Sequence, residues 1–178
     1  KSRTPLALEK LHPSFASVPR ARLWGAEPPI RHAHGLARAL GVEGGLYVMR
    51  DDQGGTVFGG GKARKLDLIL GHAMQRGVTA VATTGGTGSN HARATAMAAH
   101  ALGLGCTLAL LPEPETEEVK RNLEEMRRNG ATITIGDRAA VERARRAAEA
   151  VGAQPGGTTW IPMGGSSPLG NVAFVDAG

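Results

Sequence analysis

From residue 46 onward, short apolar runs alternate with longer segments whose apolar positions recur every three or four residues. The short runs predict strands over 46–49, 79–84, 107–111, 132–135 and 159–163. The longer segments predict helices over 62–76, 89–102, 116–129 and 138–151, and a last helix that begins near Leu169 or Gly170. Strands separated by helices of this length form βαβ units. The pattern therefore predicts an α/β fold, a parallel twisted sheet with helices on both faces.

The two ends of the chain are less regular. Pro28 and Pro29 break the pattern, and we expect residues 30–40 to form one helix. Residues 171–178 resemble the opening of a helix rather than the close of a domain. The fold is therefore expected to be incomplete at the C-terminus: a fragment, a split subunit, or a chain that continues.

Composition narrows the class of protein. Of 178 residues, 41% are hydrophobic, which is enough for a packed core. No apolar run of about 18 residues exists to cross a membrane, and the N-terminus lacks the apolar stretch of a secretory signal. Cys106 is the single cysteine, which excludes an internal disulfide and favours a small core residue over a nucleophile. These features predict a cytoplasmic protein with no membrane partner.

Charge gives little support to a nucleic-acid partner. The formal net charge is +5, and much of it comes from arginines on the predicted helices between 120 and 146, where a solvated helix face is the simpler explanation. Aromatic residues make up only 3%, too few for a surface on which bases stack. We therefore expect no nucleic-acid partner, and no metal site is predicted.

The first candidate for chemistry is the loop of residues 59–66. Three glycines open a predicted helix, and Lys62 and Lys65 lie three residues apart on one of its faces. A helix N-terminus attracts anions, and a lysine there loses its proton more easily, which suits a Schiff base. Only five of the 21 basic residues other than histidine are lysines, and two of them lie here. The alternative is that both lysines are solvated surface residues.

The second candidate is the loop of residues 83–91, which runs from a strand through glycines to a helix start. Its backbone N–H groups and hydroxyls could surround an anion. Two simpler alternatives are that Ser89 only caps the helix and that the glycines only form a tight turn. A dinucleotide loop requires a glycine where His91 stands, and no Gly-Lys-Ser/Thr follows for a nucleotide phosphate loop.

Together the two loops resemble a known family. The patterns are Gly-Gly-x-Lys-x-Arg-Lys-Leu over 59–66 and Gly-Gly-x-x-Ser-Asn-His over 85–91, with Arg-Asp-Asp at 50–52 and Ile-Pro-Met-Gly-Gly-Ser at 161–166. They resemble the pyridoxal-phosphate-dependent D-cysteine desulfhydrase and 1-aminocyclopropane-1-carboxylate deaminase family, of tryptophan-synthase-β-like fold (fold type II). The likeness runs from about residue 28 to the end and covers the N-terminal half of a typical member.

The resemblance implies a cofactor, pyridoxal 5'-phosphate, and a role for five residues. Lys62 would form the Schiff base with the cofactor and move the substrate proton, and Lys65 would help hold the cofactor phosphate. Asn90 would hydrogen-bond the ring hydroxyl oxygen. Ser89, Asn90 and His91 would hold the substrate carboxylate, and Ser89 would also assist as an acid, base or nucleophile.

The resemblance also implies an activity and a domain plan. The expected enzyme is a lyase or deaminase of a small amino acid, and the histidine at 91 favours the desulfhydrase, which releases pyruvate, ammonia and sulfide. Residues 1–76 would belong to the larger cofactor domain, 77–165 would form the smaller α/β domain, and 166–178 would begin the return to the larger one. A homo-oligomer or a complementary C-terminal chain is expected as partner.

Three positions depart from the family pattern. Gly61 stands where the family usually has asparagine, Gly88 where it commonly has glutamine, and Met49 where it often has lysine. These losses of polar groups favour a second hypothesis, a truncated or split non-catalytic subunit that needs a partner chain. A simple anion-binding α/β module is a third.

Overall fold

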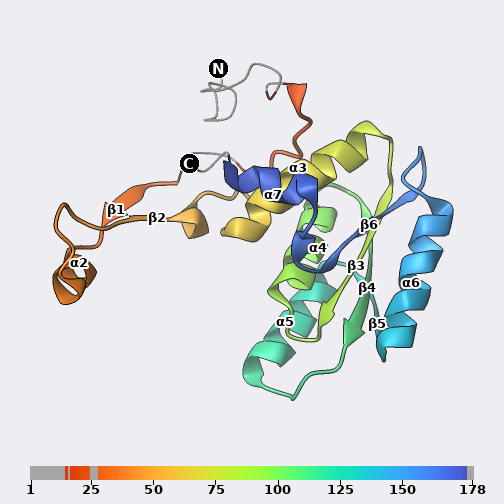
Figure 1. The fold of residues 1–178 in the computed structure, drawn as a ribbon. Helices are drawn as coiled ribbons and strands as arrows, with labels where there is room; N and C mark the ends of the chain where they lie inside the picture. The colour runs from red at the N-terminus through yellow and green to blue at the C-terminus, as the bar shows by residue number, and fades with distance from the viewer. Residues whose placement is uncertain (1–14, 16, 25–27, 176–178) are drawn as a thin grey trace.

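The centre of the computed structural model is a sheet of four parallel strands (Figure 1). They are β3 (Ala80–Gly86), β4 (Gly105–Leu111), β5 (Thr132–Ile135) and β6 (Thr158–Ile161), in the spatial order β5–β4–β3–β6. The structure describes residues 15, 17–24 and 28–175. Val81 on β3 and Leu108 and Leu110 on β4 are fully buried, as expected for inner strands of a sheet that is covered on both faces.

Helices cover both faces of this sheet, which confirms the predicted fold class (Figure 1). They are α3 (Gly61–Gln75), α4 (Asn90–Ala101), α5 (Glu117–Arg128), α6 (Arg138–Val151) and α7 (Pro168–Val175). The chain moves from β3 to β4 to β5 in one direction and then returns to the far side of β3. Because parallel crossovers are right-handed, α6 lies on the face opposite α4 and α5.

The helices on the α4 face are packed closely. Ala92, Ala96, Ala98 and Ala99 of α4 have no exposed surface, so this helix buries small side chains against the sheet. Beyond α4, helices α3 and α7 pack on each other. Cys106 is buried in the same core, and burial raises the pKa of its thiol to about 12. The prediction that it is a core residue is therefore confirmed.

Helix ends follow the signals in the sequence. Ser89, Thr116 and Asp137 each cap a helix, because their side-chain oxygens accept a hydrogen bond from the backbone N–H three residues later. Gly77 and Gly130 follow α3 and α5 with φ angles of 74° and 73°, which only glycine adopts without strain. Among the described residues, no helix is long and apolar enough to span a membrane.

The expected helix over residues 30–40 is wrong at its start. The segment forms a strand, β1 (Ile30–His32), followed by the shorter helix α2 (His34–Leu40). β1 pairs with the antiparallel strand β2 (Tyr47–Met49), and the ring of His32 stacks on Tyr47 at 4.8 Å between centroids. The pairing strand comes later in the chain, so the local pattern of residues 30–40 does not reveal it. This hairpin extends away from the sheet (Figure 1).

Two short 3-10 turns connect these elements. One, η2 (Asp51–Gln53), follows β2, and the other, η3 (Met163–Gly165), follows β6. β6 ends at Ile161, earlier than predicted, because Pro162 has no N–H with which to continue the ladder. Both turns lead directly to residues of the candidate site.

Candidate active site at the carboxyl edge of the sheet

The first glycine-rich loop is positioned by contacts from outside the sheet. Gly60 has a φ of 91°, and no side chain caps the start of α3. One turn into the helix, Arg64 donates two hydrogen bonds to Asp51 of η2, at 2.9 and 2.8 Å. Its guanidinium also lies 4.0 Å from the centroid of the Trp24 ring. The buried Arg64 therefore ties the helix that carries both lysines to two earlier segments.

The two lysines of α3 differ in exposure. Lys62 is half-buried, whereas Lys65 is only 9% exposed, so the surface alternative is wrong for Lys65. The Lys65 ammonium donates to the carbonyl oxygen of Gly164 at 3.4 Å and lies 5.6 Å from the centre of the Phe174 ring. Burial lowers the pKa of Lys65, and the positive charge of Lys62 lowers it further. Among the described residues, the two lysines are thus a concentrated positive site whose hydrogen-bond partner is the carbonyl oxygen of Gly164.

The turn after β6 closes over Lys65. Gly164 and Gly165 have φ angles of 70° and 64°. A Cβ atom on Gly165 would lie 3.4 Å from Cδ of Lys65 and 3.6 Å from Cε1 of His91. The backbone at this turn therefore comes close to side chains from α3 and α4, which are far apart in the sequence.

The second glycine-rich loop opens α4 and presents free donors. The Ser89 hydroxyl accepts a hydrogen bond from the N–H of Ala92 at 3.2 Å, so Ser89 does cap the helix. Within the described residues, the backbone N–H groups of Asn90 and His91 have no hydrogen-bond partner. Such groups at a helix start favour an anion.

A buried asparagine orients this loop. Asn122 of α5 is 1% exposed and donates to the carbonyl oxygen of Gly88 at 2.7 Å. The same amide nitrogen lies 3.5 Å from Oδ1 of Asn90. Because the Asn90 oxygen faces that donor, the Asn90 amide nitrogen remains available as a donor of its own.

His91 lies beneath the loop, at 3% exposure. Its Nε2 is 3.0 Å from the hydroxyl of Thr83 on β3, while its Nδ1 has no partner among the described residues. Burial lowers the pKa of His91 to about 4, and the charges of Lys62 and Lys65 act in the same direction. The ring is therefore neutral at neutral pH, and the two lysines are close enough to act on it.

Gly61 and Gly88, two of the positions that depart from the family pattern, lie close to side chains of other elements. A Cβ atom on Gly61 would lie 3.0 Å from the Phe174 ring of α7. A Cβ atom on Gly88 would lie 2.9 Å from a Val119 methyl and 3.1 Å from a carboxylate oxygen of Glu113. The space that a larger residue would need at these positions is thus taken by neighbouring elements.

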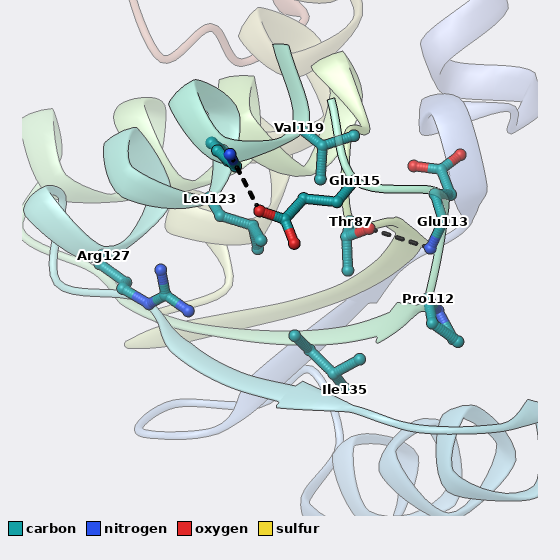
Figure 2. Close-up of a pocket in the computed structure, with 9 residues that line it drawn as sticks. Thr87, Pro112, Glu113, Glu115, Val119, Leu123, Arg127 and Ile135 are labelled. Atoms are coloured by element: carbon teal, nitrogen blue, oxygen red, sulfur yellow. Dashed lines mark hydrogen bonds and ion pairs between the residues drawn. The ribbon is translucent and has the colours of Figure 1, made fainter. Parts of the chain in front are cut away.

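Glu113 clamps the second loop to the end of β4. Its carboxylate accepts a hydrogen bond from the N–H of Gly88 at 2.6 Å, and its own N–H donates to the Thr87 hydroxyl at 3.1 Å. Figure 2 shows the Thr87 bond at the border of a pocket of about 410 Å³. The lining residues are Thr87, Pro112, Glu113, Glu115, Val119, Lys120, Leu123, Arg127 and Ile135. None of the predicted site residues lines this pocket.

The lysine loop, the α4 start and the turn after β6 meet at the carboxyl edge of the sheet, where ligands of open α/β sheets bind. The residues that the sequence singled out at these elements are Lys62, Lys65, Ser89, Asn90 and His91. Sequence reasoning missed the residues that hold them, which are Thr83, Arg64, Asp51, Asn122 and Glu113. Of these, Arg64 and Asp51 lay within quoted motifs and Thr83 opens the second candidate loop without a role assigned to it, whereas nothing local marked Asn122 or Glu113.

Comparison with known proteins identifies the family. Residues 22–177 match the family model described as pyridoxal-phosphate dependent enzyme, and the chain belongs to that family. A solved structure described as an ACC deaminase homologue superposes with a TM-score of 0.80 at 34% identity, over 94% of this chain and 51% of that one. The expected fold type II is therefore confirmed.

Individual relatives carry different names. A Pyrococcus abyssi protein, named provisionally a 1-aminocyclopropane-1-carboxylate deaminase, is 36% identical over 93% of this chain and 51% of its own length. The nocardicin C-9' epimerase of Nocardia uniformis is 36% identical over 92% and 50%. The D-cysteine desulfhydrase of Salmonella paratyphi B is 32% identical over 89% and 50%. The chain thus spans about half the length of the curated relatives it matches.

Proposed function

We propose that the chain is part of a pyridoxal-phosphate-dependent lyase or deaminase of a small amino acid, with D-cysteine as substrate. In that reaction D-cysteine and water give pyruvate, ammonia and hydrogen sulfide. The observation that carries the proposal is the meeting of two lysines, a neutral buried histidine and free helix N–H groups at one sheet edge. His91 supports the desulfhydrase over 1-aminocyclopropane-1-carboxylate deaminase, which is the alternative substrate assignment.

The donors at this edge fit an anionic aromatic cofactor. Lys62 would hold the cofactor through its amine, and Lys65 would neutralise its phosphate. The free amide nitrogen of Asn90 would donate to the ring oxygen. Bound pyridoxal phosphate supplies the electron-withdrawing ring that lets a bond at the amino-acid α-carbon break.

The remaining groups would act on the substrate itself. The N–H groups of Asn90 and His91, which have no partner within the described part of the chain, would bind the substrate carboxylate at the helix start. Lys62 would accept and return the α-proton at its Nζ atom. The Ser89 hydroxyl keeps its own hydrogen while it accepts from Ala92, so it can donate as an acid.

The domain plan, the compartment and the partner chain belong to the same proposal. Residues 1–76 and 166–178 would join a larger cofactor domain, and 77–165 would form the smaller one. The protein would work in the cytoplasm as a homo-oligomer or with a complementary C-terminal chain. A non-catalytic split subunit is the second candidate, because a side chain of α7 occupies the space beside Gly61, and side chains of α5 and of the segment after β4 occupy the space beside Gly88.

An absorbance titration with pyridoxal phosphate tests the cofactor site. The chain, alone and with any co-purifying partner, should gain a visible band that borohydride fixes to Lys62, as peptide mapping would show. Lys62→Ala should lose the band, Lys65→Ala should bind more weakly, and the exposed Lys120→Ala should match the parent. An equal band in Lys62→Ala would refute the Lys62 assignment.

The substrate needs a separate assay. The loaded protein would receive D-cysteine, L-cysteine and 1-aminocyclopropane-1-carboxylate, with sulfide, 2-oxoacid and ammonia measured in each case. Sulfide from D-cysteine alone supports the desulfhydrase. Ammonia from the cyclopropane without sulfide supports the deaminase, and a bound cofactor without turnover of any of the three supports the split subunit.

A further inference from the structure

The hydrogen bonds around Thr83 assign the protons of His91. The Thr83 hydroxyl lies 2.7 Å from the carbonyl oxygen of Ile161 on β6 and 3.0 Å from Nε2 of His91. A carbonyl oxygen only accepts, so the single hydroxyl hydrogen of Thr83 is directed to Ile161. The hydroxyl oxygen is then an acceptor for the ring, and Nε2 of His91 must carry a hydrogen.

Nδ1 of the same ring is left without a hydrogen. In a neutral imidazole only one nitrogen is protonated, so Nδ1 is an acceptor. It is buried and has no hydrogen-bond partner among the described residues, whereas buried polar atoms are nearly always paired. A ring with both nitrogens protonated would be repelled by the charges of Lys62 and Lys65, and Nδ1 has no acceptor for a second hydrogen among the described residues.

The groups around the His91 ring indicate which kind of hydrogen-bond donor Nδ1 can accept from. Cε1, the carbon between the two ring nitrogens, would lie 3.6 Å from a Cβ atom on Gly165, and Cδ of Lys65 would lie 3.4 Å from the same atom, so both side chains approach the turn after β6. The titratable groups that act on the ring are Lys62 and Lys65 of α3, both of which are amines. An unprotonated, buried and unpaired nitrogen within the electrostatic reach of two amines is suited to accept a hydrogen bond from an N–H donor with a positive charge.

We propose that Thr83 is a positioning residue that fixes His91 in the Nε2–H form, so that Nδ1 accepts a hydrogen bond from a protonated amine. This inference rests on the proposed function, because the amine is either a site lysine or the amino group of the amino-acid substrate. Where the amine is that of the substrate, Asn90 and His91 together recognise both charged groups of the amino acid. The backbone N–H groups of Asn90 and His91 take the carboxylate, and the His91 ring takes the amine rather than the carboxylate.

Nitrogen-15 NMR of the cofactor-free chain tests the tautomer directly. The wild-type His91 ring should show a protonated Nε2 and an unprotonated Nδ1, with His91→Gln used to identify its signals. Thr83→Ser, which keeps the hydroxyl, should retain this form, and Thr83→Val should give a mixture of the two tautomers. A protonated Nδ1 in the wild type, or an unchanged single tautomer in Thr83→Val, would overturn the proposal.

Small probes separate the two sources of the amine. D-Alanine carries both charged groups of an amino acid, whereas propionate carries only the carboxylate. A shift of the Nδ1 signal with D-alanine and not with propionate assigns the donor to the substrate. A shift in Lys62→Met or Lys65→Met without any probe assigns it to that lysine, and no shift in any arm contradicts the amine contact. Since none of these readouts needs pyridoxal phosphate, they are independent of the absorbance titration.

Discussion

The two glycine-rich loops both open a helix at the same edge, yet they are held in different ways. The loop before α4 is capped by its own Ser89 and bonded to Asn122 and Glu113, which belong to the neighbouring βαβ unit. The loop before α3 has no side-chain cap and depends on Asp51 before it and α7 after it. The half of the candidate site that we propose to bind an anion is therefore built into the sheet unit, while the half that carries the lysines depends on segments outside it.

The largest expected effect concerns the buried histidine of the second loop. The pKa of His91 falls from 6.5 to about 4 on folding, so below 6.5 the unfolded chain binds the proton more readily. Stability is therefore retained above pH 6.5 and lost as the pH falls to about 4, by about 3 kcal/mol at 1.4 kcal/mol per pH unit. Urea unfolding over this pH range should show His91→Gln losing less stability with acid than wild type. The exposed His100→Gln is the control, and equal pH slopes in both variants would contradict the assignment.

The next largest expected effect is a loss of stability when the anchor of the lysine loop, Arg64, is removed. Arg64→Leu removes the ion pair to Asp51 and the contact with Trp24, and it leaves a carboxylate that is 25% exposed. We expect a loss of about 2 kcal/mol in urea unfolding, below the range for fully buried pairs. Arg93→Leu breaks the more open pair with Glu125 and should cost less than about 1 kcal/mol. Equal losses would mean that Arg64 does not anchor the lysine helix.

Asn122→Ala tests whether the loop before α4 can be loosened without any change in the loop before α3. It leaves the carbonyl of Gly88 without this donor and should cost about 1.5 kcal/mol. Amide hydrogen exchange should become faster at residues 87–89, whose N–H groups are hydrogen-bonded, and stay unchanged at residues 59–65. Asn129→Ala, which loses a bond to the Glu125 carbonyl at the end of α5, is the matched control. Faster exchange at both loops would show that they are not held independently.

The smallest effect is a coupling between the first loop and α7. Gly61→Asn introduces a Cβ atom 3.0 Å from the Phe174 ring and should destabilise by about 1 kcal/mol. In a Phe174→Ala background the same substitution should cost almost nothing, so a double-mutant cycle should give a coupling of about 1 kcal/mol. Additive losses in unfolding experiments would argue against the contact.

The sequence predicted the sheet well because its signals are local. Apolar runs, the caps at Ser89 and Asp137 and the glycines after α3 and α5 lie within or beside the elements they define. The strand β1 was missed because its pairing partner, β2, lies beyond an intervening helix. Local periodicity carries no information about such a pairing.

The same limit applies to the candidate site. The candidate residues could be named because lysines, glycines and Ser-Asn-His cluster in short motifs. Their supports could not, because Thr83 and Asn122 look like ordinary strand and helix residues until the fold brings them to His91 and Gly88. Burial of Lys65 was likewise invisible, since it results from a turn about a hundred residues later in the chain.

The buried thiol of Cys106 has a practical use. Alkylating reagents attack the thiolate, and a pKa of about 12 together with burial keeps this group unreactive in the folded chain. Its alkylation rate would therefore record how often β4 becomes exposed to solvent. Because the printed sequence contains no other cysteine, one placed on either loop would also accept a spectroscopic label selectively under native conditions.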